Sequence, residues 1–121
     1  MPAKRSHVRV RHQGSVSIID LQGEINVSLE EPLKSAYAEA VGPNPSAILL
    51  NLSDVEYITS TGMAILVGLL AQAHQANRRL ATCGLSEHYR EVFQITRMTD
   101  FLEIFFDETT ALNQLQRSEE Q

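Results

Sequence analysis

The sequence predicts an α/β fold, with a largely parallel sheet of about five strands and about four helices packed against it. Three observations lead to this prediction. The chain has 121 residues, the usual size of one domain. Its composition is that of an ordinary globular protein, with 43% hydrophobic residues. After an opening hairpin, short apolar runs alternate with helical patterns, which is typical of parallel sheets.

The first two strands are expected within residues 7–25, joined by a turn at 12–14. Valine and arginine alternate at the start of this segment, as in a half-buried strand. The apolar run 16–21 forms the second strand, and Gly23 is expected to close it.

The segment 26–41 then becomes helical, with apolar residues at four-residue spacing. Ser28, followed three residues later by Glu31, has the pattern of a capping box. The sequence GPNPS at 42–46 ends this helix.

The next strand is predicted at 47–52, AILLNL, and its continuous apolar character indicates burial on both faces. A connection is expected at 53–59, followed by a helix at about 62–75. The remaining elements alternate as strand, helix, strand, helix, at 80–84, 86–98, 102–106 and 108–116. Ser86 and Asp107 are the expected caps of the last two helices. The tail 117–121 is expected to fray.

Charge and hydropathy narrow the possible partners. The formal net charge is −5, which argues against nucleic acid as the main partner. A small basic patch near the start of the chain is interpreted as a solvated tail and strand edge; it comprises Lys4, Arg5, Arg9 and Arg11. The longest uncharged apolar stretch, 62–71, is far shorter than the ~20 residues that span a bilayer. We therefore expect no direct membrane contact.

The expected compartment is the cytoplasm. No segment has the pattern of a secretion signal, because Asp20 interrupts the first apolar run. Cys83 is the single cysteine, which fits a reducing compartment. Its place in a predicted strand indicates a buried structural thiol.

Catalytic and metal-binding patterns are missing from the sequence. The histidines have no cysteine or HExxH partners, and no phosphate-binding glycine loop is present. Ser60 does not lie in a GxSxG elbow, and His74 would be about 20 Å away along the same helix. His88 remains open as a base, but nothing selects it. We expect no catalytic residue, metal or cofactor, and the protein is not expected to be an enzyme.

The polar quartet Thr59-Ser60-Thr61-Gly62 directly precedes the most apolar stretch of the chain. One hydroxyl there could cap the helix. Capping needs only one hydroxyl, however, and Gly62 leaves the start of the helix open to a close neighbour. A phosphate at a helix start is stabilised by about 0.3–1 kcal/mol. The quartet is therefore a candidate for phosphorylation as well as for capping.

The segment AILLNLSDVEYITSTGMAILVGLL, residues 47–70, resembles the signature of STAS domains, in particular that of bacterial anti-sigma factor antagonists. LQGEINV at 21–27 is similar to that family's Gly-Glu-Leu-Asp turn, and 80–105 resembles its later strand, helix and closing strand. The resemblance covers about residues 8–115. It implies one STAS domain over 1–121, expected here as a monomer.

The resemblance also implies partner switching. An unphosphorylated antagonist of this family binds an anti-sigma factor, which is also a GHKL-type serine kinase, and thereby frees the sigma factor. Phosphorylation of the serine that matches Ser60 separates the complex, and a PP2C-type phosphatase reverses the modification. The expected partner-binding residues are those around this serine: Asn26, Thr59, Ser60, Thr61, Gly62 and Met63.

Two residues depart from the family pattern, because Thr59 and Asn26 stand where the family has acids. Their neutrality could ease placement of a phosphate, or it could remove a kinase contact. We rank Ser60 first as acceptor, Thr61 second and Thr59 third. Two alternative functions stay open: a STAS subunit without a phosphorylation cycle that docks on the ATPase of a lipid-transport ABC system, and a stressosome-type scaffold subunit.

Overall fold

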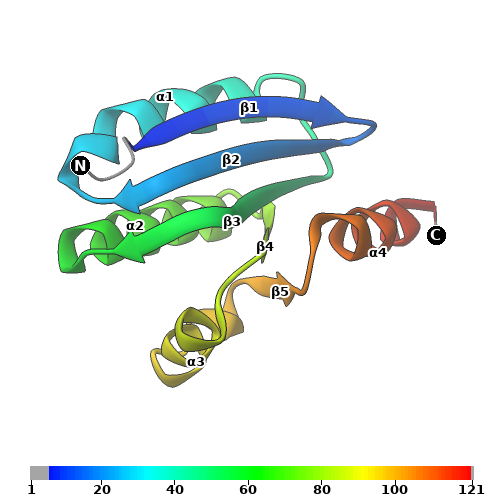
Figure 1. Cartoon of the computed structure of the whole chain (residues 1–121). Helices are drawn as coiled ribbons and strands as arrows, with labels where there is room; N and C mark the ends of the chain where they lie inside the picture. Colours follow the sequence, from blue (N-terminus) through cyan, green and yellow to red (C-terminus); the bar gives the residue numbers. More distant parts are fainter. Residues whose placement is uncertain (1–5, 121) are drawn as a thin grey trace.

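A computed structural model of the chain shows one mixed five-stranded sheet (Figure 1). It describes residues 6–120, with 117–120 described by their backbone only. The strands lie in the order of the chain: β1 (His7–Gln13), β2 (Val16–Ile25), β3 (Ala47–Ile58), β4 (Arg79–Cys83) and β5 (Glu103–Phe105). β1 pairs antiparallel with β2, and the other neighbours are parallel. The predicted mixed, mostly parallel sheet is confirmed.

Helical segments connect the parallel strands, as the alternating pattern predicted. They are the 3-10 turn η1 (Val27–Leu29), α1 (Glu30–Val41), α2 (Ser60–Gln75), α3 (Glu87–Ile95) and the 3-10 turn η2 (Met98–Asp100); a last helix, α4 (Glu108–Glu120), follows β5. In Figure 1, α4 lies apart from the other three helices.

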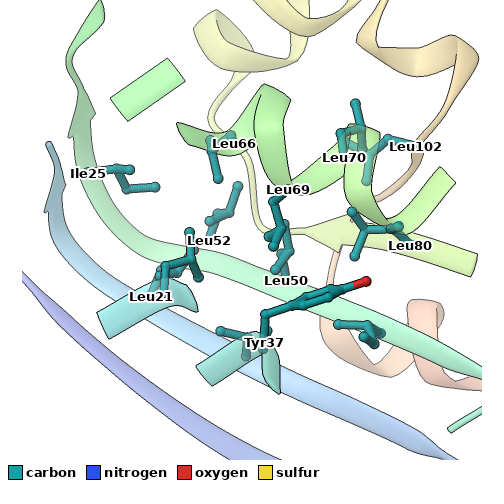
Figure 2. Close-up of a cluster of buried hydrophobic side chains, with 14 of the residues drawn as sticks. Leu21, Ile25, Tyr37, Leu50, Leu52, Leu66, Leu69, Leu70, Leu80 and Leu102 are labelled. Atoms are coloured by element: carbon teal, nitrogen blue, oxygen red, sulfur yellow. The ribbon is translucent and has the colours of Figure 1, made fainter. Parts of the chain in front are cut away.

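The hydrophobic core is divided between the two faces of the sheet. On one face, α1, α2 and α3 cover the sheet, and Figure 2 shows Tyr37, Leu50, Leu52 and Leu69 meeting there. On the other face, α4 packs on a smaller cluster that includes Leu115. Successive residues of β3 contribute to opposite clusters, which confirms that this strand is buried on both faces.

The expected connection at 53–59 is wrong, because β3 continues to Ile58 and only Thr59 separates it from α2. The strand stays paired with β2 as far as the pair Ile25 and Ile58, through two irregularities in register. Polar residues in this extension, such as Asp54 and Glu56, are exposed. Their polarity gives this stretch of strand the sequence character of a loop.

The helix ends differ in part from the predicted ones. Ser86 and Asp107 are the helix caps, since their side chains accept hydrogen bonds from the N–H groups of Tyr89 and Thr110. The Ser28 capping box is wrong: the Ser28 hydroxyl donates to Asn26 Oδ1 instead, at 2.5 Å. α3 ends at 95 rather than 98. α4 continues through 120, into the expected tail, and residue 121 lies outside the described residues.

Cys83 and the basic residues of β1 have structural contacts. Cys83 is fully buried, and its burial raises the pKa of the thiol to about 12, as expected for an unreactive thiol. Arg11 forms two hydrogen bonds to buried Asp20, while Arg9 is 3.4 Å from the same carboxylate. The other basic residues of the predicted patch, 4 and 5, lie outside the described residues.

Candidate functional site

The Thr59–Gly62 quartet lies at the edge of the sheet where β2 and β3 end and where η1 and α2 begin (Figure 1). Loops at this edge of parallel sheets commonly carry function. The quartet contacts the backbone of Ile25, the last residue of β2. Its position is therefore fixed by the sheet as well as by the helix.

Thr59 is the N-cap of α2, and its polar groups are engaged. Its side-chain oxygen accepts a hydrogen bond from the Gly62 N–H at 2.9 Å and donates one to the Ile25 carbonyl at 3.2 Å. Its own N–H also donates to that carbonyl, at 3.0 Å. The hydroxyl of Thr59 thus holds the start of the helix against β2.

Gly62 allows the start of α2 to approach β2 closely. A Cβ atom at this position would lie 1.9 Å from the Ile25 carbonyl oxygen. The close neighbour anticipated from the sequence is therefore the chain's own backbone. Any side chain at Gly62 requires the helix or the strand to shift.

Ser60 and Thr61 expose hydroxyl groups that make no hydrogen bond to another part of the chain described by the structure. They lie on different surfaces. Ser60 lines a hollow of about 400 Å³ between α2 and α3, called here the Ser60 groove. Thr61 lines a hollow of about 320 Å³ between α1 and α2, called here the Thr61 groove. The two adjacent hydroxyls thus lie on two separate surfaces of the domain.

The Ser60 groove has mostly apolar walls. Tyr57, which is 55% exposed, lines it together with half-buried Met63 and Val92. The Tyr89 hydroxyl accepts a hydrogen bond from the Ile58 N–H at 2.8 Å and so ties α3 to the end of β3. Neither Tyr57 nor Tyr89 is among the predicted partner-binding residues. Tyr89 reaches this groove on α3, whose position depends on tertiary packing and cannot be seen in the sequence.

Asn26 lies at the same end of the sheet as the quartet, but its side chain caps η1 and not α2. Its side-chain oxygen accepts hydrogen bonds from the N–H and hydroxyl of Ser28, and its amide donates to Glu24 Oε1 at 2.8 Å. Asn26 therefore caps η1 directly after Ile25. It is half-buried, and it lines neither the Ser60 groove nor the Thr61 groove.

Among the described residues, no group of three or more side chains has the composition of a metal site. Within the same residues, the structure contains no helix that is both long and apolar enough to span a bilayer.

A family model described as "Mlab, STAS domain" matches residues 8–104 of the chain. The chain belongs to the STAS domain family. BtrV of Bordetella bronchiseptica, by its name an anti-sigma factor antagonist, is 34% identical over 85 residues, which cover 70% of this chain and 71% of BtrV. The anti-sigma-F factor antagonist RsfB of Mycobacterium tuberculosis is 28% identical over 95 residues, covering 69% of this chain and 78% of RsfB.

Solved structures agree with the family assignment at the level of the fold. An anti-sigma factor antagonist from Mycobacterium paratuberculosis has a TM-score of 0.77 and 20% identity, covering 93% of this STAS domain and 95% of that chain. The antagonist SpoIIAA, which is known in an unphosphorylated and a phosphorylated form, has TM-scores of 0.72 and 0.69 at 16% and 17% identity. These alignments cover 91% and 90% of this chain and 98% and 99% of SpoIIAA.

Proposed function

We propose that this STAS domain is an anti-sigma factor antagonist that binds its partner through the surface around Ser60 and is released when Ser60 is phosphorylated. The observation that carries the proposal is the exposed, unengaged Ser60 hydroxyl on the first turn of α2. The names of the curated relatives support the antagonist role. They also support a regulator rather than an enzyme.

The quartet favours Ser60 as the phosphate acceptor. Thr59 is half-buried and uses its hydroxyl in two hydrogen bonds, so modification there would break the helix cap. Thr61 is exposed and remains second in rank. In the proposed step, Ser60 Oγ bonds to the terminal phosphorus of ATP, the bond between that phosphorus and the bridging oxygen breaks, and ADP leaves. The hydroxyl proton passes to the kinase or to water.

A phosphate on Ser60 would change the surface offered to a partner. The added group carries about −1.5 to −2 charges at neutral pH. The neighbouring groove wall is largely apolar, with Tyr57, Met63 and Val92. A partner that places apolar or acidic groups there would lose contact after phosphorylation.

The proposal also includes the partners of the protein and the compartment in which it acts. The anti-sigma factor is a GHKL-type serine kinase, and a PP2C-type phosphatase restores the unmodified form. The protein acts in the cytoplasm as one STAS domain over 1–121. In this proposal, Met63 contacts the partner from the same groove as Ser60, and Asn26 and Thr61 contact it from the flanking surfaces. Thr59 and the buried Gly62 hold the first turn of α2 in place for this contact.

The proposal is tested by incubating the full chain with ATP and each GHKL-type anti-sigma kinase of the same organism, followed by mass spectrometry. We expect one added phosphate, located on Ser60 by fragmentation and absent from Ser60→Ala. Thr61→Ala, the matched control on the next residue, should still be modified. Ser60→Asp should weaken binding to the same kinase at least tenfold, while the thermal unfolding midpoint stays that of the wild type. Modification of Ser60→Ala, or full affinity of Ser60→Asp, would contradict the proposal.

The description of the matching family model favours one second candidate, because it names Mlab rather than an antagonist. In this alternative, the unmodified Ser60 surface docks permanently on the ATPase of a lipid-transport ABC system. Co-purification of the chain with such an ATPase, combined with no phosphate transfer by any anti-sigma kinase, would favour this candidate over the first.

A further inference from the structure

The Ser60 groove contains a basic side chain that the proposed function does not use. His88, on the first turn of α3, lines the groove together with Ser60. Within the described part of the chain, its imidazole makes no hydrogen bond or ion pair, and its contact is with the Tyr89 ring. His88 is exposed, so its ring nitrogens are available to a new acceptor.

The first turn of α3, which carries His88, is tied to the end of β3. The His88 ring packs edge-on against Tyr89, with ring centroids 4.8 Å apart. The Tyr89 hydroxyl is in turn bonded at 2.8 Å to the N–H of Ile58, two residues before Ser60. His88 is therefore next in sequence to a residue that is bonded to the strand end preceding Ser60, and both His88 and Ser60 line the groove.

The charges of the two grooves differ. The residues that line the Ser60 groove include no carboxylate, and its remaining ionisable groups are the phenols of Tyr57 and Tyr89. The carboxylates nearest in sequence, at positions 56, 87 and 91, are not among its lining residues. The Thr61 groove, by contrast, is lined by the carboxylate of Glu30 and the ammonium group of Lys34. An added phosphate thus meets an imidazole with no carboxylate in the groove at Ser60, and an acid together with a base at Thr61.

We propose that the Ser60 groove is a binding site for the phosphate of phosphorylated Ser60, in which His88 binds the phosphate oxygens. Tyr57, which also lines the groove and is exposed, offers its hydroxyl as a second donor. A phosphate bound in this way fills the groove that the unmodified protein leaves open for its partner. This inference rests on the proposed function for the modification of Ser60, and it adds a regulatory role for His88.

The effect of His88 on the second pKa of the bound phosphate can be measured without a kinase or a partner. The second ionisation of a phosphoserine lies near pH 6. A nearby imidazolium favours the doubly ionised phosphate, which lowers the second pKa of the phosphate.

The test uses the full chain with genetically encoded phosphoserine at position 60, in wild-type, His88→Gln and His88→Arg backgrounds. The pH titration of the phosphorus-31 resonance gives the second pKa of the phosphate in each. We expect the wild-type value to lie about half a unit or more below that of His88→Gln, and His88→Arg to retain the low value. The unmodified variants should unfold at the wild-type temperature, because His88 is exposed.

Phosphoserine encoded at position 61 provides the matched control. There, His88→Gln should leave the phosphate pKa unchanged, because Thr61 faces the other groove. Equal phosphate pKa values at position 60 in all three backgrounds would contradict the proposed phosphate-binding site. A pKa shift found in a protein that no anti-sigma kinase modifies would support the binding site and contradict the proposed function instead.

Discussion

At the residue scale, the four positions of the quartet have separate tasks. Thr59 holds the helix start, Gly62 permits the close contact with β2, and Ser60 and Thr61 leave their hydroxyls exposed on different sides. The sequence pattern indicated a cap and a possible modification site as alternatives. The structure separates them, because the cap is one residue and the free hydroxyls are its neighbours.

Gly62 offers a direct test of the close contact, because α2 contains a second glycine with different surroundings. A Cβ at Gly62 would meet the Ile25 carbonyl oxygen, whereas a Cβ at Gly68 would have nothing within 4 Å. We expect Gly62→Ala to lower the free energy of unfolding by about 1–3 kcal/mol through overpacking. Gly68→Ala should raise it by about 0.5–1 kcal/mol, since alanine is the better helix former. Urea unfolding of both variants measures this, and a Gly62→Ala protein as stable as wild type would exclude the contact.

At the element scale, periodicity predicted the alternation of strands and helices and the buried character of β3. It failed where polar residues occur within an element. Asp54 and Glu56 made the end of β3 look like a loop, although its backbone remains paired with β2. Ser28 matched a capping motif locally, but Asn26 supplies the cap. The groove beside Ser60 depends on where α3 packs, and the spacing of residues along one helix carries no such information.

The bond between α3 and β3 can be tested with two tyrosines that line the same groove. Tyr89→Phe removes the acceptor of the Ile58 N–H, and we expect it to lower the free energy of unfolding by about 1 kcal/mol. Amide hydrogen exchange at Ile58 should accelerate as well. Tyr57→Phe removes an exposed hydroxyl and should change stability by less than about 0.5 kcal/mol. Unchanged exchange at Ile58 in Tyr89→Phe would show that α3 is held by packing alone.

At the scale of the whole molecule, one polar network joins elements that are distant in the sequence. Asp20 on β2 is 7% exposed and accepts hydrogen bonds from Arg11 at 2.6 and 2.8 Å and from Asn51 at 2.8 Å. Arg11 also bonds Glu108 at the start of α4, at 2.5 Å. The network thus ties β1, β2, β3 and α4 together. It contains Arg9 and Arg11, which the sequence indicated to lie at a solvated strand edge. β1 is an edge strand of the sheet, but Asp20 engages both side chains.

The protonation of Asp20 should therefore affect the stability of the whole fold. Burial opposes ionisation of this carboxyl, but hydrogen bonds from Arg11 and Asn51 outweigh it and hold its pKa below the ordinary value. A lowered pKa in the folded state stabilises the fold above the unfolded pKa of about 3.9, and this contribution is lost as the pH falls through the folded pKa. We expect Asp20→Asn to lower the free energy of unfolding by about 1–3 kcal/mol at pH 7.

The difference between wild type and Asp20→Asn should begin to shrink as the solution is acidified below about pH 4, because the carboxyl of the unfolded chain is protonated first. It should be smallest below the lowered folded pKa, where the wild-type carboxyl is neutral too. Glu31→Gln is the matched control, since Glu31 pairs with Lys34 at 3.5 Å on the exposed surface and should change stability by less than about 0.5 kcal/mol. Urea unfolding across pH measures both effects. A pH-independent difference for Asp20→Asn would mean that its cost comes from altered packing, and that the charge of Asp20 does not hold β1 and α4 to the sheet.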